Sequence, residues 1–142
     1  MFVLGSDSDS AKTVWDTVAF AIKQKIDTIQ MSILTPFPGT KVHEDLKKQQ
    51  RIFSHDWRLY DGQHVVFNPK LVTAKQLQVD IVKAYAKFYS LSRSFSLLMK
   101  FHFRNAVYRF MGYRIIREWR EKNGHMLWLG QAHPVLSENP VK

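Results

Sequence analysis

Apolar residues near the start of the chain form two short continuous runs, separated by a stretch with helical spacing. The first run, residues 2–4, ends in a polar loop, and residues 11–25 then place an apolar side chain every three or four positions. The second run follows at residues 29–34. This order predicts a parallel strand pair joined by a crossover helix, with Asp9 or Ser10 as the helix N-cap.

The second apolar run stops in the loop 35–39, which contains two prolines and a glycine. Proline has no N–H to donate to a neighbouring strand, so pairing must end near Leu34. The glycine permits a sharp reversal, and Thr40 is a favourable N-cap for a helix over residues 40–50. Rigid loops at the carboxyl ends of parallel strands are where α/β proteins bind ligands, so this loop is a candidate site.

The rest of the chain favours helices. A capping-box pattern at Thr73 opens a helix with one apolar stripe. The stripe consists of Leu77, Ile81, Tyr85 and Phe88. A further helix is predicted over residues 93–111, interrupted at Gly112 and resumed through Trp119. Two glycines and two prolines in residues 124–142 predict an irregular tail.

Charge is distributed unevenly along the chain. The formal net charge of +9 divides into zero over residues 1–56, +3 over 57–92 and +6 over 93–122. We predict four segments with these approximate limits. They are two strand–helix units over 1–56, a substrate-side loop and amphipathic helix over 57–92, a basic aromatic helical extension over 93–123, and the tail.

Arginine and aromatic residues alternate within residues 93–122. This pattern is compatible with a helix that packs its aromatic side chains on the fold, with a helix on an anionic membrane surface, and with nucleic-acid binding. We favour the packed helix, with membrane-surface contact next. Nucleic acid is the least favoured partner because the sequence contains no recognised nucleic-acid-binding motif.

Composition excludes several classes of protein. The 142 residues contain no cysteine, which rules out disulfides and thiolate metal sites, and no His-x-x-x-His pair suggests a metal site. No apolar run of about 18 residues occurs, and residues 2–4 are too few for the apolar part of a signal peptide. We therefore expect a cytoplasmic protein, with association at a membrane surface as the open alternative. Motifs for a phosphate-binding loop, a nucleophile elbow or a dinucleotide fingerprint are also absent.

Two loops contain candidate functional residues. Trp57, Tyr60, Asp61 and His64 place two aromatic rings, a carboxylate and an imidazole within eight residues, a composition suited to covering a substrate and transferring a proton. A packed loop with satisfied polar groups is the alternative. The loop 5–9 could bind a carboxylate or phosphate through its N–H groups, or could only cap the helix.

These segments resemble one enzyme family. Residues 2–9, residues 32–40 and the Trp-x-x-Tyr-Asp-Gly-x-His motif of residues 57–64 are similar to the carboxyl-terminal part of radical S-adenosylmethionine (SAM) enzymes. The nearest type carries a B12 (cobalamin)-binding domain and a helical C-terminal extension. The resemblance covers residues 1 to about 92. It implies that the two predicted strands are the fifth and sixth strands of a partial (β/α) barrel.

The resemblance also implies roles for individual residues. At the two strand ends, the residues that would contact the adenosine of SAM are Val3, Gly5, Leu34 and Thr35. Trp57 and Asp61 would lie on the substrate side, and Tyr60 and His64 are the catalytic candidates. The resemblance further implies a small or lipid-like substrate.

The family's Cys-x-x-x-Cys-x-x-Cys loop, which ligates a 4Fe-4S cluster, has no counterpart in this sequence. We therefore expect the chain to be a fragment of a radical SAM enzyme whose partner is a missing N-terminal half. The full-length enzyme would bind SAM and the cluster, with cobalamin as a further candidate cofactor. The alternative function is a non-catalytic basic module that binds a membrane surface or nucleic acid.

Overall fold

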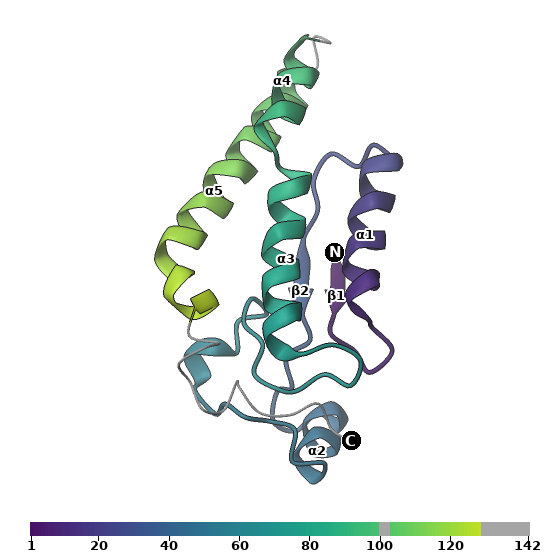
Figure 1. The fold of residues 1–142 in the computed structure, drawn as a ribbon, viewed down its shortest axis with the longest axis vertical. Coiled ribbons are helices and arrows are strands. Elements are labelled where there is room, and N and C mark those ends of the chain that lie inside the picture. Colours follow the sequence, from purple (N-terminus) through teal and green to yellow (C-terminus); the bar gives the residue numbers. More distant parts are fainter. Residues whose placement is uncertain (100–102, 129–142) are drawn as a thin grey trace.

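The computed structural model describes residues 1–99 and 103–128. The elements in chain order are β1 (Phe2–Leu4), α1 (Ala11–Lys23), β2 (Met31–Ile33), α2 (Lys41–Lys48), the 3-10 helix η1 (Trp57–Leu59), α3 (Ala74–Phe88), α4 (Leu91–Met99) and α5 (Phe103–Trp128) (Figure 1).

The two strands form a parallel pair, with Phe2 opposite Met31 and Leu4 opposite Ile33. The connecting helix α1 starts directly after Ser10, which is one of the two predicted N-caps. The predicted strand–helix–strand unit is therefore confirmed. The second strand is shorter than the apolar run that predicted it, because regular pairing covers only three residues of β2.

The main core lies between the strands and the two helices α1 and α3, which pack against each other. Its largest fully buried side chains are Val14, Val18, Ile33, Leu77 and Phe88. They come from α1, β2 and α3, and the residues from α3 belong to its predicted apolar stripe. A second, smaller cluster around Tyr60 and Phe67 covers the carboxyl ends of the strands.

Threonine caps fix the starts of two helices where the sequence predicts them. The Thr40 hydroxyl accepts a hydrogen bond from the His43 N–H and starts α2. The Thr73 hydroxyl accepts one from the Gln76 N–H and starts α3. Each cap satisfies a donor that has no partner inside the helix.

The predicted helix over residues 93–111 is wrong in its limits. The structure has two helices here, with α4 ending at Met99 and α5 beginning at Phe103. These two helices pack against each other, and α5 also contacts α3. The predicted single helix is therefore two helices that pack against each other, a division for which the local sequence preferences of residues 93–111 give no signal.

The predicted interruption at Gly112 is also wrong, since α5 continues through this residue to Trp128. A Cβ atom built on Gly112 would collide with the Tyr89 ring. The glycine therefore permits close packing of α5 on that ring, and the cost of glycine within a helix is tolerated. Residues 124–128 of the predicted irregular tail are helical as well, and residues 129–142 lie outside the described residues.

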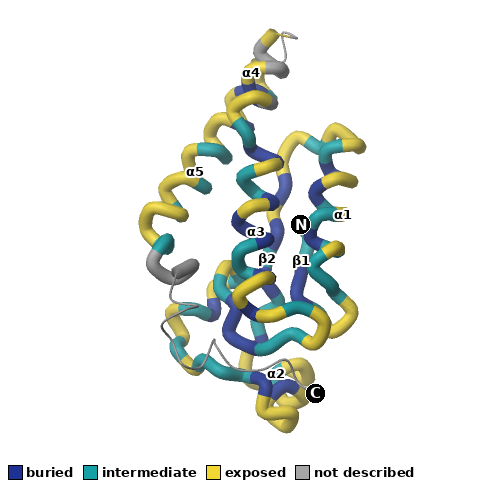
Figure 2. Tube along the Cα trace, viewed as in Figure 1, coloured by how far each residue is buried: buried dark blue, intermediate teal, exposed yellow. Residues whose placement is uncertain are grey.

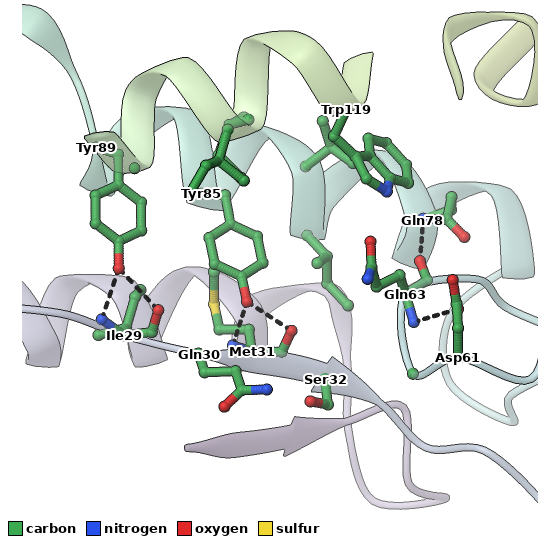
Figure 3. Close-up of a pocket in the computed structure, with 16 residues that line it drawn as sticks. Ile29, Gln30, Met31, Ser32, Asp61, Gln63, Gln78, Tyr85, Tyr89 and Trp119 are labelled. Atoms are coloured by element: carbon green, nitrogen blue, oxygen red, sulfur yellow. Dashed lines mark hydrogen bonds between the residues drawn. The ribbon is translucent and has the colours of Figure 1, made fainter. Parts of the chain in front are cut away.

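Two tyrosine side chains occupy the outer edge of β2, the edge that faces away from β1 (Figure 3). The Tyr89 hydroxyl accepts a hydrogen bond from the Ile29 N–H and donates one to the Ile29 carbonyl oxygen, both at 2.9 Å. Tyr85 bonds to both main-chain groups of Met31 in the same way. A strand edge presents main-chain groups that need partners, and here hydroxyl groups of α3 and the residue after it supply them.

Candidate functional site

The carboxyl ends of both strands point toward the lower end of the molecule in Figure 1, where α2 lies. Ligands of parallel α/β proteins bind beyond this end of the sheet. The segments that meet here are the loop 5–10 after β1, the loop 34–40 after β2, and the loop 56–64.

The loop after β1 satisfies its own N–H groups. The N–H groups of Gly5 and Ser6 donate to Asp9 Oδ2 at 3.0 and 2.9 Å. Gly5 has a φ of +98° and is buried so close to Leu77 that an added Cβ would lie 2.8 Å from Leu77 Cδ2. An anionic ligand at this loop would have to displace the Asp9 carboxylate.

Asp7 in the same loop forms a cluster with two basic residues that sequence reasoning missed. Arg51 donates to both carboxylate oxygens of Asp7, at 2.6 and 3.0 Å, and Lys70 Nζ lies 2.9 Å from Asp7 Oδ2. The hydrogen bonds from Arg51, with a further contribution from Lys70, lower the pKa of Asp7 to about 2. The guanidinium also donates from Nε to the Asn68 carbonyl oxygen at 2.7 Å, so it links three segments.

The end of β2 is more open than the end of β1. Leu34 and Thr35 are both half-buried. The Thr35 hydroxyl donates to the Ile33 carbonyl oxygen at 3.1 Å, and its own carbonyl oxygen accepts the Phe37 N–H at 3.0 Å. The Thr35 N–H forms no hydrogen bond within the described part of the chain. It is a main-chain donor that a ligand at this strand end could use.

Tyr60 is buried, and its hydroxyl donates to the Ser54 carbonyl oxygen at 2.9 Å. Its ring centroid lies 5.0 Å from that of Trp57 and 6.3 Å from that of Phe37, in the loop after β2. Burial raises the pKa of the Tyr60 hydroxyl. Through Tyr60, the loop 56–64 packs beside the loop that follows β2, and Trp57 remains largely exposed there.

Asp61 and His64 form a hydrogen-bonded dyad. Both carboxylate oxygens lie 3.0 Å from His64 Nδ1, and Oδ1 also accepts the N–H groups of Gln63 and His64. A carboxylate can only accept hydrogen bonds, so His64 Nδ1 carries a proton and Nε2 presents a lone pair when the ring is neutral. This nitrogen is buried without a partner among the described residues, and the ring centroid lies 5.7 Å from that of Trp119.

The dyad adjoins a cleft of about 310 Å³ between the outer edge of β2, α3 and α5 (Figure 3). One end of the cleft is polar and the other is lined by aromatic and aliphatic side chains. The polar lining includes Asp61, Gln63 and Gln78. Gln78 holds the loop in place, since it accepts the Val65 N–H at 2.9 Å and donates to the Gln63 carbonyl oxygen at 2.8 Å.

The structure thus separates the candidate residues into three places. Gly5, Leu34 and Thr35 lie at the strand ends, and Asp61 lines the cleft with His64 beside it. Val3 presents its side chain at the surface of β1. The functional roles of all these residues stay predictions.

Neither a metal site nor a membrane-spanning helix is found in residues 1–99 and 103–128. No three His, Asp or Glu side chains in these ranges gather closely enough to ligate a metal ion. None of the helices there has both the length and the hydropathy needed to cross a bilayer.

Several curated proteins are similar to this chain over 88 residues, 62% of its length. The bacteriochlorophyllide d C-12(1)-methyltransferase of Chlorobaculum tepidum is 36% identical, and an uncharacterized methyltransferase of Pyrococcus horikoshii is 33% identical. The anaerobic magnesium-protoporphyrin IX monomethyl ester cyclase of Cereibacter sphaeroides is 27% identical. The matched region covers 19%, 19% and 14% of these relatives, so the chain spans about a fifth of their length or less.

These relatives support a radical SAM-like family for the matched part of the chain. No family model matches the sequence. No solved structure matches it either.

Proposed function

We propose that this chain is the carboxyl-terminal portion of a radical SAM enzyme of the methyltransferase type, which acts together with a cluster-binding N-terminal half. The methyltransferases and the cyclase that it resembles support this proposal, and so does the parallel β1–β2 unit, which the family resemblance assigns to the last two barrel strands. The observation that carries it is the difference between the two edges of this small sheet.

One edge is closed and the other is open. At the outer edge of β2, Ile29 and Met31 are bonded to tyrosine hydroxyls, and the Ile33 N–H donates to the Gly62 carbonyl oxygen at 2.7 Å. At β1, Phe2 and Leu4 pair with β2, so the main-chain groups of Val3 between them face away from it. Because an open edge pairs readily with another strand, β1 is where the strands of the missing half would add.

The residues of this chain are suited to binding SAM but not to ligating the cluster. The sequence has no cysteine, so a 4Fe-4S cluster does not fit this polypeptide and must be held by the other half. The end of β2 fits a role in binding SAM, because Leu34 and Thr35 are accessible and the Thr35 N–H is available to an adenine nitrogen. SAM supplies the methyl or radical chemistry when bound, and cobalamin is a further cofactor that the family resemblance allows.

The cleft beside β2 is proposed as the substrate side, with α5 as its cover. By their names, the Chlorobaculum tepidum methyltransferase acts on bacteriochlorophyllide d and the Cereibacter sphaeroides cyclase on magnesium-protoporphyrin IX monomethyl ester. The aromatic and aliphatic lining of the cleft suits the apolar part of a substrate of this kind, and Asp61, Gln63 and Gln78 would orient its polar groups. His64 Nε2 would accept a proton from a group that reaches the dyad, with Asp61 holding the ring in position.

A reconstitution experiment tests the proposal. The Chlorobaculum tepidum C-12(1)-methyltransferase would be produced without the segment that this chain matches, and mixed with the full chain after iron–sulfur reconstitution. We expect the two components to form a complex that cleaves SAM, and we expect neither component to cleave SAM alone. Val3→Pro removes a main-chain donor at the open edge and should prevent assembly, whereas Val3→Thr should not. Absence of a complex with the unaltered chain would contradict the proposal.

A further inference from the structure

The helices α4 and α5 expose a large apolar surface. They pack against each other through small side chains such as Ser94 and Ala106, which are buried, while larger apolar side chains face outward. Figure 2 shows that most of the described length of both helices is exposed. The outward set comprises Leu91, Phe95, Met99, Val107, Phe110 and Ile115. We call this surface the hairpin face.

The hairpin face is continuous along α5. Residues three or four apart on a helix lie on the same side, so Phe103, Val107 and Phe110 form one exposed row, and Met111 and Ile115 belong to the row beside it. Phe95 is 63% exposed and Ile115 is 62% exposed, although each is large and apolar. Scattered apolar residues are ordinary on a protein surface, but a contiguous patch of several large apolar side chains indicates an interaction site.

Basic residues dominate the charge of most of the same region, and the acidic residues Glu118 and Glu121 of α5 lie beyond that part and pair with Lys122 and Arg117. Residues 81–117 contain eight Lys or Arg residues and no Asp or Glu. Arg104 and Arg114 are exposed on α5 among the apolar rows. Arg109 has a different role, because its guanidinium is buried and donates to the carbonyl oxygens of Ile26 and Phe88. The surface is therefore both apolar and cationic.

We propose that the hairpin face binds the surface of an anionic lipid bilayer. Apolar and aromatic side chains at the level of the headgroups, with arginines among them, are the features of helices that lie in a membrane interface. The cations would pair with anionic lipid headgroups, and the lack of carboxylates over 37 positions removes repulsion from the same headgroups. This binding would hold the cleft of Figure 3 near the bilayer, since α5 lines both.

Vesicle co-sedimentation of the full chain tests the proposal. We expect binding to vesicles of phosphatidylglycerol and phosphatidylcholine that weakens as salt is raised, and much weaker binding to phosphatidylcholine alone. Arg104→Glu with Arg114→Glu should weaken binding to the anionic vesicles by about 25-fold or more, since each basic residue near such a surface contributes about 5-fold. Phe95→Ser with Val107→Ser should weaken binding by at least about 10-fold through lost apolar burial.

Matched controls lie elsewhere on the surface. Lys47→Glu with Lys48→Glu reverses two exposed charges on α2, and Phe20→Ser with Leu71→Ser removes two exposed apolar side chains outside the hairpin face. All variants would be compared by far-UV circular dichroism. Controls that weaken vesicle binding as much as the hairpin variants overturn the proposal. The proposal is also overturned if the chain does not bind vesicles but forms a dimer in sedimentation velocity, and if the hairpin variants dissociate that dimer.

Discussion

The Tyr85 hydroxyl bonds to both main-chain groups of Met31, accepting the N–H and donating to the carbonyl oxygen at 2.8 Å. A side chain from α3 thus stands where a third strand would otherwise pair with β2. Burial raises the pKa of this hydroxyl, which keeps it protonated and able to donate. The outer edge of β2 is therefore closed to further strands, whereas β1 has an open edge among the described residues.

We expect Tyr85→Phe to lower the free energy of unfolding by about 1–3 kcal/mol, because it leaves the N–H and carbonyl groups of Met31 without partners in a largely buried position. Urea denaturation would measure the change. Tyr108→Phe is the control, since Tyr108 is exposed on α5, and should alter stability by less than about 0.5 kcal/mol. Equal effects of the two substitutions would show that the hydroxyl of Tyr85 is not needed at the edge.

Replacing each of two glycines in α5 by alanine should change the stability of the chain in opposite directions. Gly112→Ala places a methyl group against the Tyr89 ring and should destabilise the chain by about 1–3 kcal/mol. Gly124→Ala meets no atom within 4 Å and should stabilise the helix by about 0.5–1 kcal/mol. Thermal and urea unfolding of both variants would measure this, and a stabilising Gly112→Ala would contradict the close packing of Tyr89.

The sequence predicts those parts of the fold that local chemistry determines. Thr40 and Thr73 cap helices because each hydroxyl meets an N–H only three residues away. The function of Gly112 depends on Tyr89, which lies far from it in sequence, and the edge bonds of Tyr85 reach a residue 54 positions away. Periodicity identifies Tyr85 as an inward-facing residue of a helix, but it contains no information about which carbonyl its hydroxyl meets.

In the candidate site too, contacts between residues close in sequence are predicted and contacts between distant residues are not. The cluster of aromatic, acidic and imidazole side chains in the loop 56–64 identifies Asp61 and His64, which form a dyad because they are three residues apart. Arg51 was missed, since a single arginine after a helix has no local signal for its pairing with Asp7 across 44 positions. Trp119 was likewise predicted only as part of a helix, and its place beside His64 depends on how α5 packs.

The ion pair of Asp7 with Arg51 should make stability depend on acid pH. The pKa of Asp7 is about 2 in the folded chain, below the ordinary value of 3.8, so its stabilising effect is complete above about pH 4 and is lost as pH falls through about 2. The carboxylate is 44% exposed, and screening by solvent reduces the effect to about 1 kcal/mol.

Asp7→Asn should therefore lower the free energy of unfolding by about 1 kcal/mol at neutral pH and make little difference near pH 2. Urea titrations across this range would test it. Asp16→Asn removes the exposed pair with Lys12 and should change stability by less than about 0.5 kcal/mol. A constant difference between Asp7→Asn and the unaltered chain at all pH values would show that the charge of Asp7 is not the cause.

The dyad makes a prediction about the proton on His64. Because Asp61 accepts from Nδ1, the neutral ring should be the Nδ1–H tautomer, in contrast to the Nε2–H form that free histidine prefers. Two-bond ¹H–¹⁵N correlation spectra of the full chain above neutral pH would show Nε2 with the nitrogen shift of an unprotonated ring atom. Asp61→Ala should shift the ring toward the Nε2–H form, because its Nδ1 partner is gone.

His43 is the control for this measurement. Its Nδ1 lies 3.0 Å from the Pro36 carbonyl oxygen, another group that can only accept, and its tautomer should be the same in the unaltered chain and in Asp61→Ala.

In the reconstituted enzyme, His64→Ala should slow turnover while SAM binding is retained, as expected of a residue that accepts a proton from substrate. If His64 is found as the Nε2–H tautomer, it cannot be that base, and the dyad would be a packing contact of the loop against Trp119.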